Sequence, residues 1–212
     1  MHKIVLLSLL LIVSVLHLSA QHAGFKVINN ETDFKKKYAT AAGSIQTIKC
    51  DFVQEKNLSM LSEKINSKGN FLFKKQNKVK MEYTKPFHYL LIINGDKVML
   101  KDEQKSNTFS SHNNKLFENI NKIIIDCVQG TAMDNKNFKV SVYENEKQYL
   151  LVLVPNKKEL SDFFSKINIY IDKKDYSVNK LDMIDPSGDN TLITFINKQF
   201  NINITDAEFF IK

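Results

Sequence analysis

Hydrophobic and polar positions alternate with a period of two along most of the chain, a pattern typical of half-buried strands. Turn residues separate these segments, notably Lys85-Pro86, the pair Asn94-Gly95, which is a strong hairpin signal, and residues 186–189. The pattern predicts about ten antiparallel strands, over residues 48–53, 69–75, 79–84, 89–93, 97–101, 138–143, 148–154, 166–171, 178–184 and 191–197, with residues 202–210 as a candidate last strand.

Two longer segments follow helical spacing instead. The first begins at Glu31 and ends at Gly43, with Asn30 or Thr32 as its N-cap. The second covers residues 115–130 and ends at Gly130, a natural C-cap. Because its three consecutive isoleucines extend past a single apolar stripe, the second helix needs apolar cover on more than one side. A short amphipathic piece over residues 160–164 suggests a third helix.

These elements predict a mainly β (α+β) fold, and the absence of linkers and repeats predicts one domain over residues 21–212. A twisted sheet of ten strands curls, so its concave side must be filled or lined. Large apolar side chains mark one face of the strands. Two interpretations stay open: the helices complete an ordinary packed core, or they leave a hydrophobic pocket for acyl chains.

The N-terminus has the order of a secretory signal. Lys3 precedes an apolar stretch from Ile4 to Leu16, and the small residues Ser19-Ala20 offer a cleavage site. The apolar stretch is shorter than the roughly 20 residues that a membrane span needs. The sequence therefore predicts a signal peptide over residues 1–20 and export to the periplasm, with a retained anchor as the alternative.

Two cysteines, Cys50 and Cys127, remain after cleavage. Export permits one disulfide between them. Both residues fall on apolar faces, so the alternative is a pair of buried thiols that act as small hydrophobic side chains.

The charge balance is basic, with a formal net charge of +7 and thirty basic residues, all of them lysine. Arginine provides the planar fork that reads guanine and clamps phosphate, and its absence disfavours nucleic acid as a partner. Lysine still attracts phosphate without specificity, but here it is interleaved with acidic residues. A solvated lysine-rich surface is the simpler interpretation.

The sequence offers no motif for catalysis. His22, His88 and His112 have no neighbours at metal-ligand spacing, and no nucleophile, zinc or phosphate-loop motif is present. We therefore expect no enzyme activity, no catalytic residue, no metal and no cofactor.

Five segments with recognisable patterns follow the first helix in a fixed order within residues 31–210. They are IKCDFVQ (48–54), GNFLFKK (69–75), VKMEYTKP (79–86), IINGDKVML (92–100) and DPSGDNTLITFIN (185–197). Together they resemble the LolA family of periplasmic outer-membrane lipoprotein carriers. The Asn-Gly turn and the lysine-rich character look most like the carriers of Bacteroidetes-type bacteria.

The resemblance implies an incomplete antiparallel β-barrel around a hydrophobic cavity, with an N-terminal helix and lid helices. Lys75 matches the family's lid-latching basic residue, usually Arg, and Val79 matches the residue at the cavity mouth. Met81 and Leu72 stand where the family has Trp. The expected lipid-cavity residues are Phe52, Phe71, Phe73, Met81, Tyr83, Leu90, Ile92 and Met99. The expected lid residues are Leu116, Phe117, Ile120, Ile123 and Ile124.

The resemblance also implies a function. A monomer would take acylated lipoproteins from an inner-membrane lipoprotein-releasing ABC transporter and deliver them to an outer-membrane acceptor or to the membrane itself. The alternatives are a sensor of lipoproteins with the same half-barrel, a carrier of another envelope lipid, and an envelope enzyme. Such sensors usually carry a second domain after the barrel, and the printed sequence has no room for one.

Overall fold

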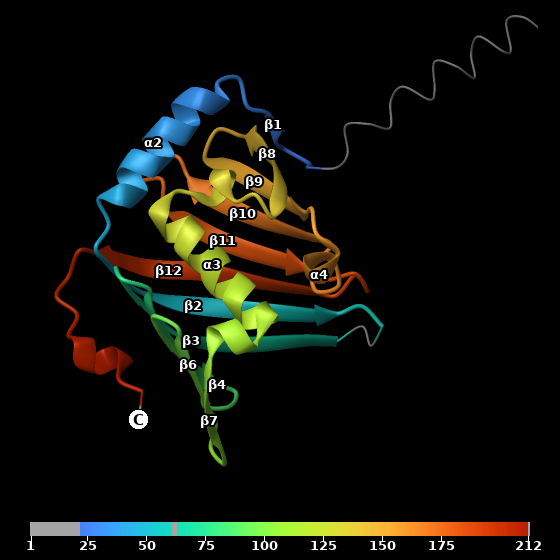
Figure 1. The fold of residues 1–212 in the computed structure, drawn as a ribbon. Coiled ribbons are helices and arrows are strands. Elements are labelled where there is room, and N and C mark those ends of the chain that lie inside the picture. Colours follow the sequence, from blue (N-terminus) through green and yellow to red (C-terminus); the bar gives the residue numbers. More distant parts are fainter. Residues whose placement is uncertain (1–21, 61–62, 212) are drawn as a thin grey trace, which may run out of the picture.

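An antiparallel sheet forms the framework of the protein (Figure 1). The computed structural model describes residues 22–60 and 63–211, and the predicted signal peptide over residues 1–20 lies outside this part of the chain. Within the described residues the sheet has twelve strands, in the order β1-β8-β9-β10-β11-β12-β2-β3-β4-β5-β6-β7. The strands are β1 (Lys26–Val27), β2 (Thr47–Leu58), β3 (Glu63–Lys74), β4 (Lys78–Lys85), β5 (Tyr89–Asn94), β6 (Lys97–Lys101), β7 (Ser106–Ser110), β8 (Phe138–Glu144), β9 (Gln148–Pro155), β10 (Lys166–Asp172), β11 (Val178–Ile184) and β12 (Asn190–Phe200).

The strand order joins two runs of successive antiparallel hairpins. Strands β2 to β7 form one run, β8 to β12 form the other, and pairing between β12 and β2 connects them. Strands β1 and β7 are the edges of the described sheet and do not pair with each other. The predicted mainly β fold with an incomplete antiparallel barrel is confirmed. The sequence pattern missed β1, which has two residues, and β7, whose sequence SNTFS lacks an apolar alternation.

Two long helices lie against the same face of the sheet (Figure 1). The helices are α2 (Glu31–Gly43), α3 (Lys115–Gln129) and the short α4 (Lys158–Ser161), with 3-10 turns η1 (Ser111–Asn113), η2 (Ala132–Asp134) and η3 (Asp206–Phe209). The predicted caps are present, since Asn30 Oδ1 accepts the Asp33 amide at 3.0 Å and Gly130 follows α3 with a φ of +73°.

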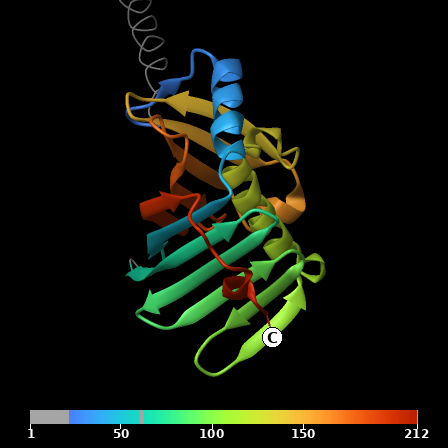
Figure 2. The same ribbon diagram turned by 90° about the vertical axis from the view of Figure 1, so that its left-hand side faces the viewer.

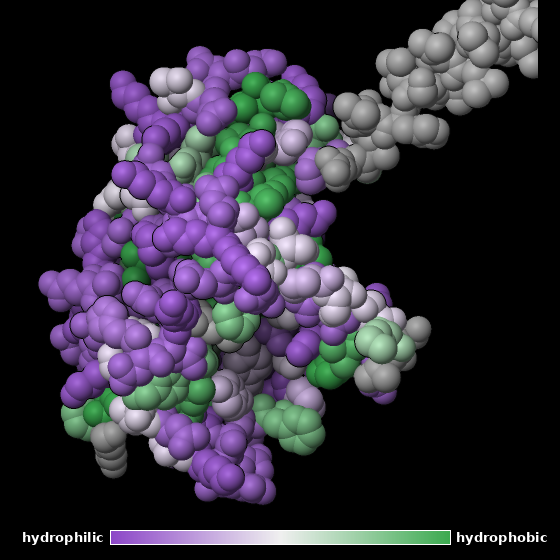
Figure 3. Space-filling model, turned by 45° about the vertical axis from the view of Figure 1, so that its right-hand side comes forward, coloured by the Kyte–Doolittle hydropathy of each residue, from purple (hydrophilic) through white to green (hydrophobic). Residues whose placement is uncertain are grey.

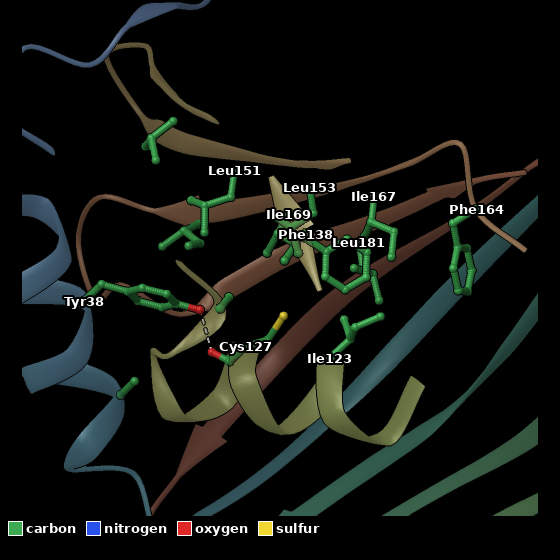
Figure 4. Close-up of a cluster of buried hydrophobic side chains, with 14 of the residues drawn as sticks. Tyr38, Ile123, Cys127, Phe138, Leu151, Leu153, Phe164, Ile167, Ile169 and Leu181 are labelled. Atoms are coloured by element: carbon green, nitrogen blue, oxygen red, sulfur yellow. Dashed lines mark hydrogen bonds between the residues drawn. The ribbon is translucent and has the colours of Figure 1, made fainter. Parts of the chain in front are cut away.

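Helix α3 lies over two separate hydrophobic clusters. Ile123 and Cys127 belong to the first cluster, with residues of α2 and of strands β8 to β11 (Figure 4). Phe117, Ile124 and Val128 pack against the second cluster, built on β2 to β6 and β12. The helix therefore has apolar cover on two sides, as its run of isoleucines requires.

The C-terminal segment does not form the candidate strand expected over residues 202–210. Asn201 takes a left-handed φ of +57°, and the segment crosses the opposite face of the sheet (Figure 2). There Ile204 and Phe209 form a third cluster with Ile92 and Met99. Strand β12 is already paired on both sides, by β11 and β2, so it offers no free edge that the tail could extend.

Gly69 shows how tightly β3 is packed. A Cβ atom at this position would lie 2.1 Å from the Glu82 carbonyl oxygen and 2.7 Å from Phe52 Cζ. Because the first of these is backbone, Gly69→Ala is expected to lower the free energy of unfolding by about 3 kcal/mol. Gly43→Ala is the matched control, since nothing lies within 4 Å of its added Cβ. Denaturant unfolding of both variants measures the difference, and an unaffected Gly69→Ala protein would contradict the packing described.

Candidate functional site

An apolar cavity of about 80 Å³ lies between the concave face of the sheet and the helices α2 and α3. Its walls come from both hydrophobic clusters and from strands that are far apart in the sequence. The wall residues include Cys50 on β2, Phe71 on β3, Met81 on β4, Leu181 on β11, and Ile193 and Phe195 on β12. Most of the lining side chains are apolar. Among the described residues, the hydroxyl groups of Tyr176 and Ser177 and the ammonium group of Lys198 add polar or charged atoms to the wall.

Helix α3 contributes Ile124, Cys127 and Val128 to the cavity wall. Ligand pockets usually measure roughly 300–1,000 Å³, so a cavity of about 80 Å³ is too small for a long acyl chain. The side chains of α3 therefore take up space beneath the helix that a long acyl chain would need.

The C-terminal end of α3 is firmly attached to α2. The Tyr38 hydroxyl donates to the Cys127 carbonyl oxygen at 2.6 Å (Figure 4). Burial raises the pKa of Tyr38, which keeps the hydroxyl protonated as a donor. A Cβ on Gly130 would lie 2.8 Å from both Ala39 Cα and the Tyr38 carbonyl oxygen, so this close approach requires glycine.

A buried carboxylate adds a second attachment at the same end. Asp126 of α3 accepts hydrogen bonds from Asn135 Nδ2 at 2.6 Å, Thr131 Oγ1 at 3.1 Å and Lys122 Nζ at 3.2 Å. Asn135 is itself buried and lies just after η2. The loop that follows α3 is therefore fixed to the last turns of the helix.

Removing this carboxylate should loosen the attachment. Asp126→Ala leaves the buried amide of Asn135 and the hydroxyl of Thr131 without their acceptor, and we expect a loss of about 2–3 kcal/mol in unfolding free energy. Asp134→Ala is the control, because Asp134 pairs with Lys35 on the exposed surface. This substitution should lower the unfolding free energy by less than about 1 kcal/mol. Thermal unfolding compares the two, and equal losses would contradict a special role for Asp126.

The N-terminal half of α3 is held by weaker contacts. Lys115 forms a salt bridge of 3.6 Å with Glu159, and both side chains are more than half exposed. Phe117 packs edge-on against Phe109 of β7, with ring centroids 5.1 Å apart. Exposed ion pairs contribute little to stability, so the Lys115–Glu159 pair adds little to the attachment of this half.

Cys50 and Cys127 are both free and buried, and both line the cavity. The structure therefore has two thiols where the sequence left open a disulfide. Burial raises the pKa of Cys50 to about 12 and raises that of Cys127 further. Both thiols stay protonated at neutral pH, so neither is an activated nucleophile.

The structure brings part of the expected cavity set together. Phe71 and Met81 line the cavity, and Phe52 and Phe73 lie in the same cluster without reaching it. Tyr83 packs at the edge of that cluster, where its hydroxyl donates to Gln54 Oε1 at 2.9 Å.

Three expected cavity residues lie elsewhere. The structure places Leu90, Ile92 and Met99 on the opposite face of the sheet, beneath the C-terminal tail. Strand β5 reads Tyr-Leu-Leu-Ile-Ile, and so many consecutive apolar residues do not indicate which alternate positions face the helices. The pairing register between β4 and β5 decides which residues face the helices. Leu91 pairs with Met81 and Ile93 pairs with Val79, so Leu91 and Ile93 lie in the second cluster.

The expected lid residues divide between the two clusters. Ile124 lines the cavity, Phe117 packs on the second cluster, and Ile120 and Ile123 belong to the first. Leu116 is part of α3, and its side chain lies outside the described part of the structure.

The expected latch and mouth residues have different surroundings from those predicted. Lys75 Nζ donates to the Gly43 carbonyl oxygen at 2.6 Å, so it binds the C-terminal end of α2 and not α3. A cation is favourable there, since the last carbonyl groups of a helix carry partial negative charge. Val79 is 0% exposed and lies inside the second cluster, away from any rim.

Sequence reasoning missed Lys198, which lines the cavity from β12. Ile193 and Phe195 face inward, so strict alternation would place Asn197 and Gln199 inward and Lys198 outward. A register irregularity between Ile196 and Gln199 reverses this order. The sequence indicates this bulge only weakly. Asparagine is one of the residue types that accept a positive φ, and Asn197 has a φ of +56°.

The polar groups of the described chain do not assemble into a metal site. Within residues 22–60 and 63–211, no three His, Cys, Asp or Glu side chains gather in a way that could hold a metal ion. No helix in that part of the chain has the length and apolar character needed to cross a membrane. Hydrophilic side chains cover most of the face shown in Figure 3. A curved antiparallel sheet with two helices across one face and an apolar cavity between them defines a class of half-barrel proteins.

The chain belongs to the family of the outer membrane lipoprotein carrier protein LolA, whose model matches residues 43–212. Among curated protein sequences none matches this chain. The resemblance recognised in the five sequence segments is thereby confirmed.

Solved structures with a similar fold have little sequence in common with this chain. An uncharacterized conserved protein from Thermus thermophilus is 10% identical with a TM-score of 0.50, and the match covers 85% of this chain and 93% of that one. A LolA superfamily protein from Nitrosomonas europaea is 8% identical with a TM-score of 0.44, over 84% and 97%. The Pseudomonas aeruginosa MucA/MucB complex is 9% identical with a TM-score of 0.47, over 85% and 60%. At 10% identity, the likeness to the Thermus thermophilus protein concerns the fold alone.

Proposed function

We propose that this protein is a periplasmic carrier of lipoproteins, which binds their acyl chains in the cavity beneath α3. The observation that carries the proposal is the small apolar cavity between the sheet and α3, in a chain of the LolA family. Removing an acyl chain from water gains about 0.8 kcal/mol per methylene group, so a soluble protein needs such an enclosed apolar site to move a lipoprotein across the periplasm.

The attachments of α3 suggest how the cavity opens. The C-terminal end of the helix is fixed by Tyr38 and Asp126, and its N-terminal half by exposed or half-buried contacts. We propose that the N-terminal half swings away from the sheet when cargo enters. Phe117 then gives up its contact with Phe109, and Ile120 gives up its packing on the first cluster, and this cost favours release of the cargo at its destination.

The proposal includes the partners expected from the sequence. Acylated lipoproteins are the cargo, an inner-membrane lipoprotein-releasing ABC transporter supplies them, and an outer-membrane acceptor or the membrane itself receives them. The carrier needs no cofactor and makes or breaks no covalent bond. Its monomeric state, its lack of enzyme activity and its lack of nucleic-acid binding stay predictions, and so does its export by the signal peptide over residues 1–20.

A release assay tests this function. Spheroplasts that synthesise a labelled outer-membrane lipoprotein are incubated with the protein purified from a periplasmic fraction. The proposal predicts that the lipoprotein appears in the supernatant as a soluble one-to-one complex. If it stays on the membrane while a known carrier from the same species extracts it, the carrier function is wrong. Lipid analysis of the purified protein and a search for a signalling partner would then test the other-lipid and sensor alternatives.

A further inference from the structure

A β-bulge turns one lysine toward the apolar cavity. Strand β12 pairs with β2 up to Ile196, which faces Asp51, and pairing resumes at Gln199, which faces Lys49. Asn197 and Lys198 therefore both lie opposite Cys50, a cavity residue. The Asn197 side chain donates to Asp51 Oδ2 at 2.7 Å on the outer face, and Lys198 takes the inner face. Bulges commonly serve to re-aim a side chain in this way.

Neutral acceptors hold the ammonium of Lys198 in place. Its Nζ donates to Ser177 Oγ and to Asn179 Oδ1, and its third hydrogen bond, to the Val178 carbonyl oxygen, is long at 3.5 Å, so this third donor is the one that an anion would take. Ser177 in turn donates to Asp175 Oδ1 at 2.7 Å, and Asn179 donates to Asp172 Oδ2 at 3.1 Å. The carboxylates of Asp175 and Asp172 thus bind the residues that accept from Lys198, and not the ammonium group itself. Among the described residues, no carboxylate forms a salt bridge with Lys198 itself.

The surroundings of Lys198 disfavour its charged form. Loss of water lowers the pKa of Lys198, and the charges of Asp175 and Asp172 oppose that decrease only in part. A half-buried ammonium without a contacting counter-ion, at the wall of an apolar cavity, is costly for the empty protein. An anion that arrives beside it recovers part of this cost, because charge-assisted hydrogen bonds are the strong ones.

We propose that Lys198 binds the anionic head group, a carboxylate or a phosphate, of an acyl amphiphile whose hydrocarbon chain occupies the cavity. This inference rests on the proposed function, since it requires that the cavity accept acyl chains. It adds a ligand class that the apolar walls alone do not select: a fatty carboxylate or an acyl phosphate is preferred over a neutral amphiphile of the same chain length.

Competition between matched ligands tests the proposal. The neutral fluorophore N-phenyl-1-naphthylamine is bound to the protein and displaced by dodecanoate, dodecyl phosphate or dodecanol. The wild-type protein is expected to bind the better anion at least about tenfold more tightly than dodecanol, the gain of one charge-assisted hydrogen bond. The ratio of dodecanoate to dodecyl phosphate affinity identifies which head group fits.

Variants connect this preference to Lys198. Lys198→Met keeps an apolar stem of similar length and is expected to bind all three amphiphiles equally, with dodecanol affinity retained. Lys198→Arg keeps the charge and should retain the preference. Lys49→Met, on the exposed face of the neighbouring strand opposite Gln199, is the control and should behave like the wild type. Thermal unfolding establishes that each variant is folded.

The outcomes separate the two proposals. If the wild type binds dodecanol and the anions equally, or if Lys198→Met keeps the preference for anions, the role of Lys198 is wrong and the acyl cavity stands. If no amphiphile displaces the fluorophore or binds directly in calorimetry, the acyl cavity is wrong and the head-group site fails with it.

Discussion

Val128→Phe is expected to reduce lipoprotein release by at least about tenfold while the protein stays folded. Val128 lies on the last turns of α3, half-buried, and contributes to the wall of the 80 Å³ cavity. A phenyl ring at this position occupies the space that an acyl chain needs and adds apolar contacts beneath α3. Overpacking of this kind costs about 1–3 kcal/mol, which a stable domain tolerates. The release assay with spheroplasts measures the effect.

A matched substitution separates blocking of the cavity from a general effect of the larger side chain. Val154→Phe places the same ring on β9, at a side chain that is 43% exposed and does not line the cavity. It should release lipoprotein like the wild type. Full release by a folded Val128→Phe protein would contradict the assignment of this cavity as the cargo site.

Phe209→Ala is expected to lower the free energy of unfolding by about 3–5 kcal/mol. Phe209 is 0% exposed, and it packs with Ile92 and Met99 on the face of the sheet opposite the cavity. Lys74 and Lys78 reinforce the contact by pairing with Asp206 at 2.7 and 2.9 Å. Without the aromatic ring, the tail leaves an apolar strip of β5 and β6 partly uncovered.

The neighbouring aromatic residue is the control for this prediction. Phe210 is 64% exposed, so Phe210→Ala should change stability by less than about 0.5 kcal/mol. Denaturant unfolding compares the two variants. Because the third cluster lies away from the cavity, the Phe209→Ala protein that remains folded should still release lipoprotein. Equal stability of the two variants, or a specific loss of release by folded Phe209→Ala, would contradict this placement of Ile92 and Met99.

Local patterns predicted the elements of the fold well. The helical spacing around Phe34 and Tyr38 and the caps at Asn30 and Gly130 all correspond to observed features. Helical spacing and capping depend on residues that are close together in the chain, so they can be predicted from the sequence alone. The tail over residues 202–210 was predicted wrongly, because whether an alternating segment joins a sheet depends on a free edge, and β12 has none.

The cavity was harder to predict because its walls depend on register. In β5 the four consecutive residues 90–93 are all apolar, so the choice between Leu91 and Ile92 as the inward residue needed the pairing with β4. In β12 a bulge inverts the alternation and turns Lys198 inward. Lys75 was matched to a latch on the lid, but which helix end it reaches depends on the three-dimensional arrangement, and it binds α2.

Photo-crosslinking of cargo tests the central claim most directly. A lipoprotein whose acyl chains carry a terminal diazirine is released into complex with the protein, irradiated, and digested for mass spectrometry. Crosslinks are expected on the cavity walls formed by β2, β11, β12 and the C-terminal half of α3, with Ile124, Val128, Leu181, Ile193 and Phe195 as the residues most exposed to the chain. Crosslinks confined to the opposite face around Ile92 and Met99, or to the outer surface, would contradict that claim.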